Sequence, residues 1–154
     1  MDAMRIECLK QIRDSFLHLR DKAIFLSKLS SGLDDTDLFE LKISDFEVNE
    51  FDICYLEGTR VKTEVLYQTF FNSEAVSMIE LYIKERKKEL EKHNLELKND
   101  DWLFANIRAN IEYDKERNEI SREYDKCKTS AFSEALKLVC RKLDIKNITP
   151  KSLR

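Results

Sequence analysis

Only two glycines and one proline interrupt this chain of 154 residues. Glycine and proline end helices and make tight turns more strongly than other residues, so their scarcity favours long helices and few turns. The length suits one domain, and nine Phe, five Tyr and one Trp provide enough apolar surface for a core. We therefore expect residues 1–154 to form a single, mostly helical domain.

Apolar residues recur every three or four positions in several segments, which is the period of one helix face. Gly32 can adopt the left-handed conformation that closes a helix, and Pro150 suits the first turn of another. We expect helices over residues 4–19, 20–30, 34–41, 73–92 and 129–143, and one more that opens at Thr149.

The period changes to an alternation of faces between residues 51 and 71, as in β-strands. With a turn at Gly58-Thr59, this segment predicts an antiparallel hairpin, and residues 43–48 are expected to add a third strand. The fold class predicted is thus α+β, mostly helical with a small antiparallel three-stranded sheet. The polar segment 106–128 is expected to be a loop or an exposed helix.

The net charge of −3 and the pI of about 5.6 lack the basic surplus of most DNA-binding domains. Four scattered cysteines without C-x-x-C spacing, and two separate histidines, predict neither a zinc site nor any other metal, and no cofactor. Reduced thiols and the lack of a long apolar stretch favour a cytoplasmic protein that does not contact membranes.

Four motifs occur in a fixed order: "RDKAIFLSKLSSGLDDTDLFELKISDF", "RVKTEVLYQTFFNSEA", "DWLF" and "ITPKSLR". In that order they resemble the catalytic domain of tyrosine recombinases, the phage-integrase family, over residues 19–154. The hairpin motif is most similar to that of archaeal integrases, which often reads Arg-x-Lys-Thr-x-Val-x-Tyr-x-Thr-Phe. The resemblance implies site-specific DNA recombination and integration as the function.

The resemblance also implies a set of site residues. In this family a tyrosine attacks DNA without a metal, two arginines hold the scissile phosphate, and a hairpin lysine protonates the leaving oxygen. The lysine falls on Lys62, a histidine of the family on Lys151, and the second arginine on Arg154. Arg60 is a further candidate DNA contact. The first arginine falls on Asp34, whose carboxylate would repel a phosphate.

The tyrosine nucleophile of the family would follow Arg154, whereas all five tyrosines precede it. We therefore expect a domain truncated at its C-terminus that does not itself cleave DNA. The implied partners are double-stranded DNA, bound weakly by this chain alone, and other recombinase subunits, which would associate the chain with the nucleoid.

Two alternatives stay open. The first is a catalytically inactive relic or regulator that binds DNA or a protein partner, and the second is an unrelated α/β interaction domain that resembles the family by chance. The same residues also have ordinary structural explanations. Asp34 can cap a helix or join an acidic metal-binding cluster, whereas Arg60, Lys62 and Lys151 can be solvated surface charges.

Overall fold

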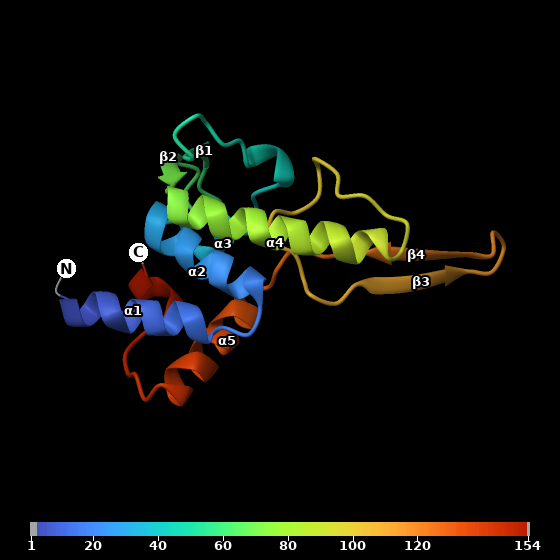
Figure 1. Cartoon of the computed structure of the whole chain (residues 1–154). Coiled ribbons are helices and arrows are strands. Elements are labelled where there is room, and N and C mark those ends of the chain that lie inside the picture. Colours follow the sequence, from blue (N-terminus) through green and yellow to red (C-terminus); the bar gives the residue numbers. More distant parts are fainter. Residues whose placement is uncertain (1–2, 154) are drawn as a thin grey trace.

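The computed structural model describes residues 3–153, in which a body of helices carries two β-hairpins (Figure 1). One hairpin lies against the body, and the other projects from it beyond the end of the longest helix. The helices are α1 (Ala3–Ser15), α2 (Leu19–Ser31), α3 (Asp35–Leu38), α4 (Ser73–Glu91) and α5 (Thr129–Lys142), with two short 3-10 helices, η1 (Ile43–Asp45) and η2 (Pro150–Leu153). The strands are β1 (Cys54–Thr59), β2 (Leu66–Phe71), β3 (Asn110–Asp114) and β4 (Glu119–Glu123).

Helix α2 lies at the centre of the body and contacts α1, α4, α5, β2 and η2. It is buried along most of its length, and apolar residues such as Ile24 and Phe25 share the buried positions with the polar or charged residues Arg20, Asp21, Ser27 and Lys28. Phe16 lies in the link between α1 and α2, and its ring is 5.6 Å from that of Phe25 on α2 and 6.0 Å from that of Phe132 on α5, so this link packs on both helices through aromatic contacts. The predicted end of α2 at Gly32 is confirmed, since Gly32 has the left-handed backbone conformation with a φ of 69°.

The predicted three-stranded sheet is wrong. The described residues form two separate two-stranded antiparallel sheets, β1–β2 and β3–β4. The segment expected as the third strand instead turns into η1, because the backbone N–H groups of Ile43 and Ser44 donate to the carbonyls of Asp101 and Asn99 rather than to a strand. A single bridge between Val48 and Cys54 is all that remains of the expected pairing.

The first hairpin turns later than predicted. Gly58 and Thr59 lie inside β1, and residues 60–65 form the loop. Lys62, expected on a strand, therefore lies in this loop. Backbone hydrogen bonds from Arg60 N to Val65 O and from Glu64 N to Arg60 O close the loop, and Glu64 adopts a φ of 56°.

The prediction of a loop or an exposed helix over residues 106–128 is wrong. This segment forms mainly the hairpin β3–β4. Its strands carry many charges and bury no side chain, so only the brief alternation of Ile111, Tyr113 and Ile120 with polar residues marks them in the sequence. No helix within residues 3–153 has the length and apolar character needed to cross a membrane.

Candidate functional site

A hollow of about 200 Å³ forms where α2, α3, the β1–β2 loop, the start of α5 and η2 meet. These segments come from five separate parts of the chain, so the folded body itself creates the hollow. Its lining residues are Lys28, Asp34, Asp35, Thr36, Lys62, Thr129, Pro150 and Lys151. We refer to it as the lysine hollow.

Asp34 occupies the N-cap position of α3, as predicted, with extended backbone (φ −65°, ψ 156°). Its side chain, however, makes no capping hydrogen bond to the helix. One carboxylate oxygen instead lies 4.0 Å from Nη1 of Arg60. The position is thus a cap by backbone geometry, while the side chain interacts with the hairpin loop.

Lys28 is a buried cation beneath the lysine hollow, with 1% of its surface exposed. Its ammonium forms an ion pair with the carboxylate of Asp35 and lies 3.5 Å from the carbonyl of Leu33. Burial of a lysine is tolerated only when its charge is met by such partners. The Lys28–Asp35 pair therefore neutralises one of the two carboxylates that line the hollow.

Asp37 joins α3 to the β1–β2 loop. Its buried carboxylate accepts a hydrogen bond from the backbone N–H of Val61 at 2.9 Å through Oδ1, while Oδ2 lies 3.5 Å from Nη1 of Arg60. Arg60, a candidate DNA contact, thus directs its guanidinium to Asp34 and Asp37 of its own chain. The two carboxylates hold the loop in place one residue before Lys62.

Lys62 and Lys151 lie 89 positions apart in the sequence but line the same hollow beside Asp34. Both side chains are exposed, and neither forms an ion pair within residues 3–153. Thr129, the first residue of α5, also lines the hollow, and Lys128 at the N-cap makes no side-chain capping bond. A helix N-terminus carries partial positive charge, so two ammonium groups and this terminus surround the space.

The remaining expected site residue, Arg154, lies outside the described residues. None of the described residues that line the lysine hollow is a tyrosine. Within residues 3–153 no group of three His, Cys, Asp or Glu side chains is arranged to hold a metal ion. The acidic cluster at Asp34 and Asp35 thus contributes to ion pairs rather than to a metal site.

Sequence reasoning missed Lys28 and Thr129. Lys28 lies among the apolar residues of α2, and no local pattern indicated that its partner would be Asp35, seven positions later. Thr129 was predicted only as the start of a helix. Its place in the hollow depends on how α5 packs against α2, which is a long-range contact.

A second hollow, of about 250 Å³, lies where the β3–β4 hairpin leaves the body, and we call it the hairpin-base hollow. Its lining combines apolar with charged side chains: His18, Leu19, Arg20, Tyr82, Glu85, Arg86, Glu89, Leu90, Ala105, Asn106, Ile107 and Tyr124. Burial raises the pKa of the Tyr82 hydroxyl above its ordinary value, although the nearby guanidinium of Arg86 partly opposes this. Tyr82 therefore stays neutral and accepts a hydrogen bond from the N–H of Ala105 at 3.2 Å.

No family model and no curated protein matches the chain.

Proposed function

We propose that this chain is a DNA-contacting domain of the tyrosine-recombinase type that takes part in site-specific DNA recombination and integration. The motif order in the sequence suggests it. The observation that carries it is that Lys62 and Lys151 line one hollow beside Asp34. These are the positions at which the resemblance expects a proton donor, a histidine substitute and a phosphate clamp around one scissile phosphate.

The charge balance of the lysine hollow supports an anionic ligand. Asp35 is paired with Lys28, and Asp34 lies within ion-pair distance of Arg60. The ammonium groups of Lys62 and Lys151 have no such partner among residues 3–153. A phosphate group of a DNA backbone would provide the negative charge that these two lysines lack.

Asp34 argues against strand cleavage by this chain. At the position of a phosphate-binding arginine it adds a negative charge where negative charge would grow in the transition state. We therefore propose binding without cleavage, with double-stranded DNA as the partner. Association with other recombinase subunits and a place at the nucleoid stay predictions.

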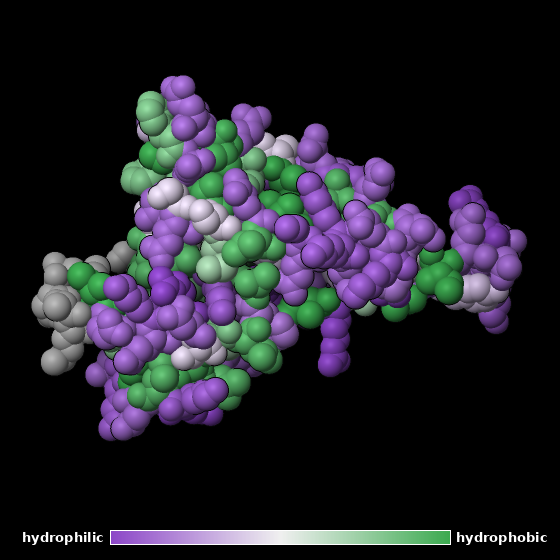
Figure 2. All heavy atoms as spheres, viewed as in Figure 1, coloured by the Kyte–Doolittle hydropathy of each residue, from purple (hydrophilic) through white to green (hydrophobic). Residues whose placement is uncertain are grey.

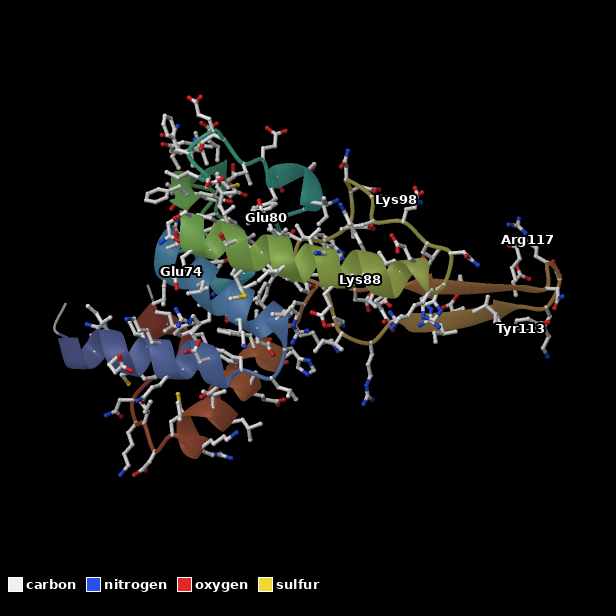
Figure 3. The ribbon with its side chains drawn as sticks, viewed as in Figure 1. Glu74, Glu80, Lys88, Lys98, Tyr113 and Arg117 are labelled. Carbon is white, nitrogen blue, oxygen red and sulfur yellow. The ribbon has the colours of Figure 1, made fainter. Side chains whose placement is uncertain are left out.

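The test is binding of a fluorescently labelled duplex, measured by anisotropy over a series of salt concentrations. Lys62→Ala and Lys151→Ala should each weaken binding and reduce the salt slope by about one. Lys88→Ala is the matched control, because Lys88 is an equally exposed lysine on α4 that does not line the hollow (Figure 3). Equal effects from all three variants would mean that binding is diffuse, and no binding at low salt would reject the proposal.

A second candidate is a catalytically inactive relic or regulator that binds a protein partner and does not use the lysine hollow as a phosphate site, which the ion pair between Asp34 and Arg60 favours. In this role the loss of the arginine is permanent and Asp34 has become part of the loop anchor. The variant Asp34→Arg distinguishes the DNA-contacting domain from the regulator. For a recombinase-type phosphate site the variant should bind DNA more tightly and change the free energy of unfolding by no more than about 1 kcal/mol. Unchanged DNA affinity would favour the regulator.

A further inference from the structure

The hairpin β3–β4 projects from the body with no side chain of its strands buried, and we call residues 110–123 the arm (Figure 1). Within residues 3–153, the arm packs on nothing but itself beyond its base. A lone two-stranded hairpin is only marginally stable in water, and it gains stability when one face packs on something apolar. Binding to another apolar surface would therefore stabilise the arm.

The two faces of the arm differ in chemistry. Tyr113 pairs with Ile120, and Ile111 pairs with Arg122, so these four side chains share one face. Ile111, Tyr113 and Ile120 are 58%, 56% and 68% exposed. The opposite face carries carboxylates from both strands: Glu112, Asp114, Glu119 and Glu123. Tyr113 and Arg117 mark the outer part of the arm in Figure 3, far from the helices.

The apolar face of the arm leads to the hairpin-base hollow. Ile107, which is 49% exposed, precedes β3 and lines this hollow together with Tyr124, which follows β4. Leu19 and Leu90 extend the apolar lining into the body. In Figure 2 apolar side chains lie where the arm leaves the body, ahead of its hydrophilic tip. Apolar side chains of the arm and of the hollow therefore follow one another at the base of the arm, and we refer to these two surfaces together as the strip.

Two opposite charges on this strip are without partners. Arg122 lies on the apolar face of the arm, and Glu85 lines the hairpin-base hollow. Neither forms an ion pair or a side-chain hydrogen bond within residues 3–153. Arg122 lies toward the base of the arm, two residues before Tyr124, so one chain carries both halves of a possible charge pair along the same strip.

We propose that the arm binds a second copy of this chain across a two-fold axis, with the apolar face of each arm on the strip of the other copy. A two-fold interface brings the same surface together from both copies, so a strip that carries apolar side chains together with one unpaired positive and one unpaired negative charge is complementary to itself. Ile120 of one copy then lies at the hairpin-base hollow of the other, and Arg122 faces Glu85. The acidic faces of both arms point outward to solvent, so their like charges are not buried.

Sedimentation equilibrium of the full chain without DNA tests the proposal independently of any DNA binding. The wild-type chain should dimerise with rising concentration. Ile120→Asn removes two apolar side chains per dimer and should raise the dimer Kd by about 100-fold. Ser121→Asn is the control, because this neighbouring residue lies on the opposite face of β4 and should leave the Kd unchanged. A wild-type chain that stays monomeric at high micromolar concentration would overturn the proposal.

Exchanging the charges of Arg122 and Glu85 provides a second test. A misfolded variant could not restore dimerisation when the two substitutions are combined. Arg122→Glu and Glu85→Arg should each raise the Kd by about fivefold or more, because each places like charges together twice per dimer. The double variant restores opposite charges and should dimerise nearly as the wild type does. A double variant no tighter than either single variant would show that the two residues do not meet.

Discussion

Asp37 on α3 accepts a hydrogen bond from the backbone N–H of Val61, 24 residues later, at 2.9 Å. The same carboxylate lies 3.5 Å from the guanidinium of Arg60. One buried side chain thus determines where the β1–β2 loop lies, and with it the position of Lys62.

Replacing Asp37 should loosen this loop in two distinguishable steps. Asp37→Asn retains an oxygen that can accept from Val61 but loses the ion pair with Arg60, so it should cost about 1 kcal/mol. Asp37→Ala loses both and should lower the free energy of unfolding by about 2–4 kcal/mol. Urea denaturation measures both values. Amide hydrogen exchange at Val61 should accelerate markedly only in the alanine variant, and similar exchange in both variants would contradict this account.

The Lys28–Asp35 pair should respond asymmetrically to mutation. Lys28 is 1% exposed, whereas the side chain of Asp35 is 14% exposed. Asp35→Ala removes the carboxylate that pairs with the buried ammonium of Lys28, and should cost about 3–5 kcal/mol. Lys28→Met fills the same space without a charge, and Asp35 can reach water, so we expect a cost below about 2 kcal/mol. Chemical denaturation of both variants checks the order, and a larger cost for Lys28→Met would contradict it.

Gly58 in β1 lies directly against the ring of Tyr67 on the paired strand. A Cβ at position 58 would lie 2.6 Å from the Tyr67 hydroxyl oxygen and 2.7 Å from Cζ. Gly58→Ala should therefore displace the ring and cost about 1–3 kcal/mol. In a Tyr67→Ala background the same change should cost nothing, because the clash is absent and alanine suits a strand better than glycine. A double-mutant cycle measures this coupling, and additive effects would exclude the clash as the cause.

Stability at high pH should depend on Cys127. Burial raises the pKa of its thiol from 9.0 to about 11. The folded state therefore holds this proton more tightly than the unfolded state. The stability is fully present below pH 9 and declines as the pH rises to 11, by up to about 3 kcal/mol.

Cys127→Ala should reduce this decline, whatever its effect on absolute stability. Guanidinium denaturation at pH 8 and at pH 10.5 gives the slope for both proteins. Burial also raises the pKa values of Cys54 and Cys140, so a smaller decline should persist in the variant. Equal slopes for variant and wild type would contradict the role of Cys127.

Sequence periodicity predicted α2, α4 and α5 well, because their packing faces repeat every three to four residues. Local end signals were also correct. Gly32 ends α2 with a left-handed backbone, and Asp34 lies at the N-cap of α3. The predicted first helix, by contrast, ended too late, since α1 stops at Ser15 and α2 begins at Leu19.

Interactions between distant segments could not be predicted in the same way. The third strand failed because residues 43–44 hydrogen-bond to carbonyls at Asn99 and Asp101, more than 50 positions away. At the candidate site, motif matching selected Lys62 and Lys151, which line one hollow. It gave no sign that Arg60 would be drawn to Asp34 and Asp37, because those ion pairs depend on where the loop lies relative to α3.

The base of the arm is held by more than strand pairing. The N–H of Asn106 donates to the Asp125 carbonyl at 2.8 Å, and the N–H of Cys127 donates to the Phe104 carbonyl at 3.0 Å. Between them, both backbone groups of Ala105 bind side chains of the helices: its carbonyl accepts from Arg20 on α2, and its N–H donates to Tyr82 on α4. The base of the arm is therefore fixed to α2 and α4 by hydrogen bonds, so a displacement of the arm would act directly on these two helices.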